Sequence, residues 1–275
     1  MGEKLSVPGR IFHCAQLIEK FLIALVPIPS LRRGVLLLAV GILFHPLMFS
    51  SVRALDCKAE KLVVALDIGH SKADPGARSA RGKTEYGFNR RFVEELLAVH
   101  GSHPHLQFRK INPSGNKISL KARTDAAAGI GADLFLSIHH DSVNEKYLKQ
   151  WQDGDTVRDH ADAFRGFSLF VSRKNPAFKN SLKVARRIAA AFKDAGLGQT
   201  LHHAEPIKGE DRELIDWDLG VYNVPFSVLR RASMPSVLVE LGVIINRREE
   251  AWLNQTSTRK QMADLIIRAL TESCR

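Results

Sequence analysis

Histidines and acidic residues stand where apolar runs of the sequence end. His70 follows the run 62–68, His139 ends the run 134–139, and His140 comes directly after it. Two histidines that converge with one carboxylate form the protein ligand set of a catalytic zinc ion, which leaves its fourth position to water. These residue types therefore predict a hydrolytic zinc centre, provided that the fold brings the two runs together.

Two glutamates complete the predicted centre. Glu85 begins a helical stretch directly after Thr84, a residue type that caps helices, and this position returns its carboxylate toward the sheet edge. Glu240 stands within the apolar run 236–241, where burial of an unpaired carboxylate costs free energy. We expect Glu85 to be the third metal ligand, and we expect a neighbouring group to compensate Glu240.

Strand-like and helix-like stretches alternate along the chain, and this order sets the fold class. Short runs rich in Val, Ile, Leu and Phe predict buried strands at residues 62–68, 106–111, 134–139, 167–172 and 236–241. Apolar residues at three- and four-residue spacing predict helices at residues 84–100, 119–129, 181–195 and 257–273. Such alternation predicts an α/β domain with a largely parallel sheet, in which ligands bind at the carboxyl ends of the strands.

Five separated segments resemble one protein family in their order, spacing and flanking residues. They are LDIGHSKADPGA at 66–77, Glu85, LKAR at 120–123, ADLFLSIHHDS at 132–142 and MPSVLVELGVIIN at 234–246. On these segments the chain resembles the zinc-dependent N-acetylmuramoyl-L-alanine amidases, the amidase-3 family, over roughly residues 62–270. The resemblance implies a single α/β domain, residues 55–275, whose six-stranded, largely parallel or mixed sheet is flanked by helices in a phosphorylase/hydrolase-like arrangement.

The resemblance also implies roles for individual residues. His70, Glu85 and His139 are expected to bind zinc, and Glu240 is expected to be the catalytic carboxylate. Adjacent side chains at the end of an extended strand point to opposite faces, so only one of His139 and His140 can face the metal. The register of the family selects His139.

The implied reaction is hydrolysis of the amide bond between N-acetylmuramic acid and L-alanine of peptidoglycan, during cell-wall remodelling or daughter-cell separation. Zinc would activate the water, and Glu240 would act as general base. Two alternatives are a zinc carboxypeptidase-type peptidase acting on stem peptides and a catalytically silent cell-wall binding module. An amidase releases intact stem peptides with a new N-terminal alanine, whereas a peptidase shortens them.

Cationic and aromatic residues are candidates for binding a carboxylate-bearing stem peptide and sugar rings. The long loop 197–224 supplies most of them, and the candidates are Arg123, Lys208, Arg212, Trp217 and Tyr222. Alternative interpretations are that Arg123 pairs with an acid near the site and that the two aromatic residues pack the loop down. His202 and His203, in the same loop, are weaker candidates for contact with the substrate.

A polar insert at residues 144–165, acidic in its middle, precedes the run 167–172. In relatives that are kept inactive until needed, a helical segment at this place can cover the zinc. We therefore interpret the insert as a regulatory flap, at which an activator protein could bind.

The first 54 residues have the layout of an export segment. The uncharged stretch 34–44 follows Arg32 and Arg33, and Val52-Arg53-Ala54 supplies a cleavage site. The prediction is a signal peptide of the secretory or twin-arginine type, and the alternative is a membrane anchor. The mature protein would then lie in the periplasm, the cell wall or the extracellular space, and would contact the membrane only through an uncleaved leader.

Composition is consistent with this interpretation. A content of 45% apolar and 25% charged residues is ordinary for a folded, soluble domain. Six of the 40 Lys and Arg residues and two of the 29 Asp and Glu residues lie in residues 1–54, so the remainder carries a net charge of +7. The sequence has no basic runs, interleaved aromatic residues or nucleic-acid module, so nucleic acid is not an expected partner. The expected partner of the basic surface is anionic cell-wall polymer. Cys57 and Cys274 could form a disulfide after export.

Overall fold

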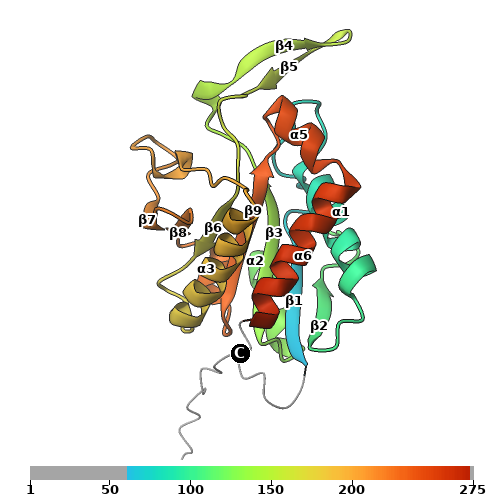
Figure 1. The fold of residues 1–275 in the computed structure, drawn as a ribbon, viewed down its shortest axis with the longest axis vertical. Helices are drawn as coiled ribbons and strands as arrows, with labels where there is room; N and C mark the ends of the chain where they lie inside the picture. Colours follow the sequence, from blue (N-terminus) through green and yellow to red (C-terminus); the bar gives the residue numbers. More distant parts are fainter. Residues whose placement is uncertain (1–60, 273–275) are drawn as a thin grey trace, which may run out of the picture. The chain divides into compact units, whose positions relative to one another are not determined.

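A seven-stranded mixed sheet runs through the computed structural model, which describes residues 61–272 (Figure 1). In spatial order the strands are β2 (Leu106–Ile111), β1 (Leu62–Ile68), β3 (Leu134–Asp141), β9 (Ser236–Val243), β6 (Ser168–Val171), β8 (Val221–Asn223) and β7 (Glu213–Asp216). The first four are parallel, β6 is antiparallel to β9, β8 is parallel to β6, and β7 is antiparallel to β8. The predicted α/β class is confirmed, but the predicted count of six strands is wrong.

Helices cover both faces of the sheet. α1 (Glu85–His100), α3 (Phe178–Asp194) and α6 (Thr256–Glu272) pack on one face, and α2 (Leu120–Gly129) and α4 (Ser227–Arg231) pack on the other. α1 and α2 begin where their caps predict, because the hydroxyls of Thr84 and Ser119 accept hydrogen bonds from the backbone N–H groups of Gly87 and Ala122. In the described part of the chain, no helix is long and apolar enough to cross a bilayer.

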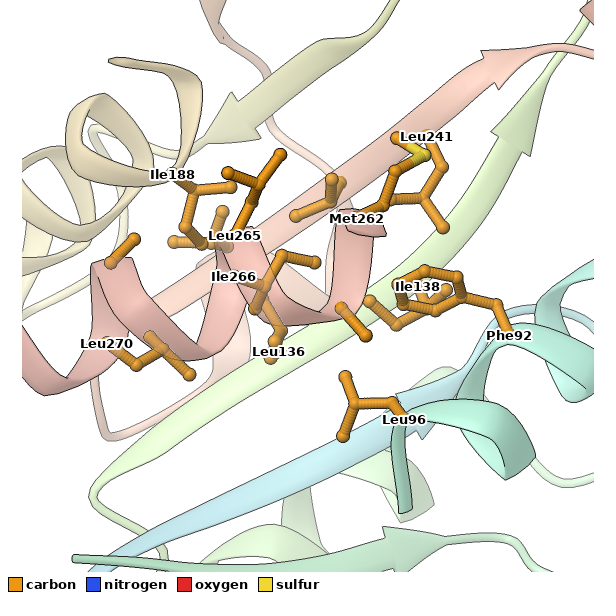
Figure 2. Close-up of a cluster of buried hydrophobic side chains, with 14 of the residues drawn as sticks. Phe92, Leu96, Leu136, Ile138, Ile188, Leu241, Met262, Leu265, Ile266 and Leu270 are labelled. Carbon is orange, nitrogen blue, oxygen red and sulfur yellow. The ribbon is translucent and has the colours of Figure 1, made fainter. Parts of the chain in front are cut away.

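The larger core lies between the sheet and α1, α3 and α6. Figure 2 shows Leu136 and Ile138 of β3 meeting Phe92 of α1 and Ile266 of α6. Each of these side chains is at most 1% exposed, and full burial of one such side chain contributes about 1.5–3 kcal/mol. Because side chains alternate along a strand, this packing turns His139 toward the opposite face, where α2 and α4 lie.

The insert 144–165 folds as a hairpin rather than as a helix. A 3-10 turn (Glu145–Tyr147) leads into β4 (Lys149–Asp153), which pairs antiparallel with β5 (Thr156–His160) and projects from the sheet in Figure 1. Of residues 144–165, only Asn144 lines the cavity described below. In this conformation the hairpin therefore leaves the candidate site uncovered.

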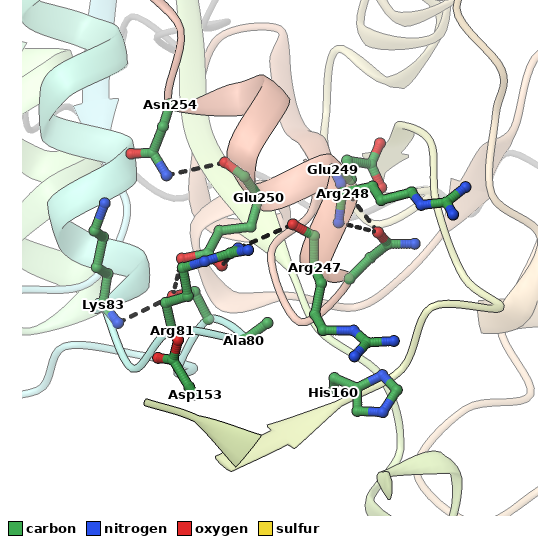
Figure 3. Close-up of polar contacts among 12 residues, drawn as sticks. Ala80, Arg81, Lys83, Asp153, His160, Arg247, Arg248, Glu249, Glu250 and Asn254 are labelled. Atoms are coloured by element: carbon green, nitrogen blue, oxygen red, sulfur yellow. Dashed lines mark hydrogen bonds and ion pairs between the residues drawn. The ribbon is translucent and has the colours of Figure 1, made fainter. Parts of the chain in front are cut away.

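Contacts of Trp151, in the middle of β4, fix the hairpin. The indole N–H of Trp151 donates to the carbonyl of Ala80, and the guanidinium groups of Arg81 and Arg247 lie 5.5 and 5.1 Å from its ring centroid. Figure 3 shows Arg81 reaching α5 (Arg247–Leu253), where it donates to the carboxylate of Glu250 at 2.7 Å. The hairpin is thus attached both to α5 and to the loop that precedes α1.

The export segment 1–54, with its cleavage site, and the pair Cys57 and Cys274 lie outside the described residues. They remain predictions from sequence.

Candidate active site

Three predicted ligands converge at the carboxyl ends of β1 and β3. His70 Nε2 lies 2.9 Å from Glu85 Oε2, and His139 Nδ1 lies 2.8 Å from Glu85 Oε1. The three donor atoms all lie within 4.8 Å of one another, and the two imidazole rings meet edge to face at 5.0 Å. Two imidazoles and one carboxylate at this spacing can share one metal ion.

Arg123 holds the loop that carries His70. Its guanidinium is buried and donates to Asp67 Oδ1 and the carbonyl of Ile68, both at 2.7 Å, and to the carbonyl of His70. His70 itself has φ +67°, a backbone conformation that costs a non-glycine residue about 1 kcal/mol. Arg123 therefore pairs with an acid near the site, as one interpretation of the sequence expected, although its side chain also lines the cavity.

Two glycines make room for the ligands. A Cβ atom added to Gly69 would lie 2.4 Å from His139 Nε2. A Cβ atom added to Gly76, which has φ +73°, would lie 2.4 Å from Glu85 Oε2 and 2.7 Å from His70 Nε2. The backbone is thus shaped around the three side chains, which supports a metal centre rather than a chance cluster.

The structure brings His139, and not His140, to Glu85. His140 points to the opposite face of the sheet, where its Nδ1 lies 2.7 Å from Asn89 Oδ1 and its ring packs on Phe88. Burial lowers the pKa of His140 to about 3, because the effect of burial outweighs the opposite effect of the Glu85 charge. His140 is therefore a neutral core residue.

Glu240 lies beside His139, because the two residues are register partners on β9 and β3. Burial of its carboxyl, together with the charges of Asp141 and Glu85, raises the pKa of Glu240 well above its usual value. Its Oε2 is enclosed and has no hydrogen-bond partner among the described residues. Among the described residues, the expected compensating group is therefore absent at Oε2, and this oxygen is left to a bound molecule.

A cavity of about 760 Å³ connects these groups. His70, Glu85, His139 and Glu240 all line it. Further lining residues include Lys117, Arg123, His203, Glu210, Arg212 and Phe226. Its volume suits a ligand of several sugar or amino-acid residues.

Of the predicted substrate-binding residues in loop 197–224, only Arg212 lines the cavity. Lys208 and Trp217 do not line it, and the Trp217 side chain is 66% exposed. Tyr222 is fully buried and its hydroxyl donates to the carbonyl of Thr200 at 2.9 Å, so it packs the loop down, as one interpretation expected.

Sequence reasoning missed Lys117, Glu210 and Phe226 as cavity residues. Lys117 lies just before α2. Its closeness in sequence to the LKAR segment was the only signal that could have marked it as a cavity residue. No signal in the sequence distinguishes Glu210 or Phe226 from other loop residues, because their place depends on how the loop folds back onto β3 and β6.

Comparison with known proteins agrees with this geometry. A family model described as N-acetylmuramoyl-L-alanine amidase matches residues 64–272. The chain is similar to a probable N-acetylmuramoyl-L-alanine amidase, AmiB, of Haemophilus influenzae, with 26% identity over 244 residues that cover 81% of this chain and 54% of the relative. It is also similar to the N-acetylmuramoyl-L-alanine amidase AmiA of Salmonella typhimurium, with 28% identity over 75% of this chain and 74% of the relative. The chain thus spans about half the length of the first relative.

Among solved structures, the catalytic domain of CwlV, an N-acetylmuramoyl-L-alanine amidase from Bacillus (Paenibacillus) polymyxa, superposes with a TM-score of 0.57 and 25% identity. The superposition covers 76% of this chain and 96% of that domain. An amidase from Clostridium difficile 630, at 20% identity and a TM-score of 0.60, has the same fold.

Proposed function

The chain belongs to the N-acetylmuramoyl-L-alanine amidase family, and on that premise we propose that it hydrolyses the amide bond between N-acetylmuramic acid and L-alanine of peptidoglycan. One observation carries the proposal. His70, Glu85 and His139 converge inside a single cavity, and Glu240 stands beside them on the neighbouring strand. This arrangement joins a metal-binding set to a proton-transfer group.

We propose zinc as the cofactor, held by His70, Glu85 and His139. The donor set fits a catalytic zinc ion, which takes three protein ligands and keeps one open position. The close approach of Gly69 and Gly76 to these side chains supports the fit. Zinc at such a site supplies Lewis-acid polarisation of the scissile carbonyl and lowers the pKa of water.

Glu240 is proposed to move the proton. Its carboxylate takes a proton from the attacking water and then delivers that proton to the departing nitrogen of L-alanine. The raised pKa of Glu240 favours the protonated form that donates in the second step.

Arg212 and Lys117 are proposed to bind a carboxylate of the stem peptide. Both line the cavity, and the Nε of Arg212 has no hydrogen-bond partner among the described residues. The guanidinium of Arg212 also lies 5.4 Å from the ring centroid of Phe226, which fixes its position in the wall. Phe226 in turn offers a flat apolar face to a sugar ring.

Digestion of purified peptidoglycan tests the proposal. The full chain is incubated with peptidoglycan, with and without a zinc chelator, and the soluble products are identified by mass spectrometry. Intact stem peptides that begin with alanine, lost on chelation and in Glu240→Gln, are the expected result. Shortened stem peptides would instead support the peptidase, and zinc binding without any product would support a silent wall-binding module.

We further propose that residues 1–54 direct export and that residues 55–275 form the catalytic domain. The substrate lies outside the cytoplasmic membrane, and the basic pair followed by an apolar stretch at residues 32–44 supports a leader. Cell fractionation with antibodies to the catalytic domain should find the protein outside the cytoplasm at a mass reduced by cleavage after Ala54. Cytoplasmic retention at full mass would contradict this.

An activator protein is proposed to bind the β4–β5 hairpin. The hairpin projects from the sheet, and Val157 at its surface is 58% exposed. Replacing residues 149–160 by a short Gly-Ser linker should leave basal digestion of peptidoglycan intact and abolish its stimulation by a cell-envelope extract. Stimulation that survives the replacement would rule the hairpin out as the contact.

A further inference from the structure

A second pair of histidines stands beside the candidate active site, and we propose that it forms, with Asp141, a second site for a divalent metal ion such as zinc. His203 Nε2 lies 2.8 Å from Asp141 Oδ2, and His202 Nε2 lies 3.5 Å from the same oxygen. These donor atoms all lie within 4.8 Å of one another, and the three residues are buried. Two imidazole nitrogens and a carboxylate oxygen are a ligand set that zinc accepts.

The outer nitrogen of each ring already has the partner that a metal-binding histidine needs. His203 Nδ1 lies 2.8 Å from Glu210 Oε2, and His202 Nδ1 lies 2.7 Å from Thr200 Oγ1. Histidines that bind metals usually donate their second N–H to such an acceptor, which fixes the tautomer and the ring orientation. Both rings are therefore set with Nε2 toward Asp141.

Surrounding aromatic rings hold the pair in place. Phe164 meets the ring of His202 edge to face at 5.4 Å, and Phe170 and Tyr222 meet the ring of His203 at 5.0 and 5.6 Å. His202 Nε2 also lies 3.2 Å from the carbonyl of Ser142, so binding of a metal at Nε2 requires the tautomer whose proton is on Nδ1, where Thr200 Oγ1 accepts it. The donors are thus ordered before any metal binds, which reduces the entropic cost of binding.

This second group shares no residue with His70, Glu85 and His139. Asp141 is the last residue of β3, whereas His202 and His203 lie in a 3-10 turn (His202–Ala204) of the loop 197–224. A metal ion here would tie that loop to the sheet and so fix the cavity wall that carries Glu210 and Arg212. The inference does not depend on the proposed amidase reaction.

Metal counting on the full chain tests the proposal. The chain is loaded with Zn²⁺, dialysed, and analysed by elemental mass spectrometry, alongside His70→Ala, Asp141→Asn, His203→Gln and the double variant His70→Ala/Asp141→Asn. We expect about two equivalents in the original chain, about one in each single variant and none in the double variant. The matched control is His103→Ala/His105→Ala, which removes a pair of histidines far from either group in sequence and should keep both equivalents.

A spectroscopic measurement guards against variants that fail to fold. Co²⁺ added to His70→Ala should give the visible absorption of a cobalt ion bound by histidine and carboxylate, and this signal should disappear in His70→Ala/Asp141→Asn. Absence of a Co²⁺ signal in folded His70→Ala, with one equivalent of zinc in the original chain, overturns the proposal and leaves the first centre intact. One equivalent that is kept in His70→Ala and lost in Asp141→Asn would instead support the second site and refute the first.

Discussion

His139 and Glu240 occupy matching register positions on the adjacent parallel strands β3 and β9. One imidazole and one carboxyl are thereby held side by side by the backbone of the sheet, and neither depends on a flexible loop for its position. Each residue can be substituted without moving the other. Experiments can therefore distinguish metal binding by His139 from proton transfer by Glu240.

Glu240→Gln should abolish catalysis without removing the metal. The amide keeps the size of the side chain but cannot take up a proton, and loss of a general acid–base group lowers kcat by about 10²- to 10⁴-fold. The measurement is the rate of stem-peptide release, with zinc content determined on the same sample. Unchanged turnover, or loss of the zinc, would contradict a role in proton transfer.

His139→Ala and His140→Ala should fail in different ways. Removal of His139 should eliminate zinc binding and activity while the fold persists, since its side chain faces the cavity. Removal of His140 should lower the free energy of unfolding by about 2–4 kcal/mol, because it leaves a cavity beside Phe88 and takes away the partner of Asn89 Oδ1.

Zinc content and urea unfolding of both variants give the answer. If His140→Ala loses the zinc and remains as stable as the original chain, the assignment of the two histidines is reversed.

Gly76→Ala should disrupt the metal centre through a single methyl group. The new Cβ would lie 2.4 Å from Glu85 Oε2, and the backbone at φ +73° disfavours alanine. We expect loss of zinc binding with the helix and strand content retained, measured by zinc analysis and circular dichroism.

Gly154→Ala is the matched control. Gly154 also has a positive φ, +59°, but a Cβ atom there meets nothing within 4 Å. This variant should cost about 1 kcal/mol of stability at most and keep the zinc. Equal loss of zinc in both variants would mean that backbone strain, and not crowding of the ligands, is responsible.

The sequence predicts those parts of the fold that rest on local patterns. β1 and β2 have the predicted bounds: β1 is a nearly continuous apolar run, and β2 begins and ends with a buried apolar residue. Thr84 and Ser119 mark the starts of α1 and α2 through side-chain capping, which acts within three residues. The placing of His70, Glu85 and His139 together follows from the same local signals and from the resemblance to the family.

The parts that the sequence did not predict depend on long-range packing. β8 has only three residues and gains its hydrogen bonds from β6 and β7, so no periodicity can reveal it. Trp217 and Tyr222 lie close together in the sequence, yet one is 66% exposed and the other fully buried. Residue type alone predicts the same role for both aromatic side chains. The fold of the loop exposes one and buries the other.

Stability should fall between about pH 4.5 and pH 7 because of Glu249 on α5. Burial raises the pKa of this carboxyl to about 7, although backbone N–H groups of Gly166 and Val243 donate to it and act in the opposite direction. A carboxyl whose folded pKa exceeds its unfolded value binds its proton more tightly when folded. Its contribution is therefore complete below about pH 4.5 and is lost as the pH rises through 7.

A shift of this size corresponds to about 3 kcal/mol, and Glu249→Gln should remove this part of the pH dependence while the part due to buried Glu240 remains. The amide keeps a carbonyl oxygen for the two backbone donors and carries no charge at any pH, so the variant should be the more stable protein at pH 8. Urea unfolding of the original chain, Glu249→Gln and the α1 surface control Glu94→Gln, at intervals from pH 4.5 to 8, measures the slope. The control should retain the slope of the original chain, because Glu94 is about half exposed and its ion pair with Arg90 lies on the surface. If the slope is as steep in Glu249→Gln as in the original chain, burial of Glu249 does not contribute to the pH dependence.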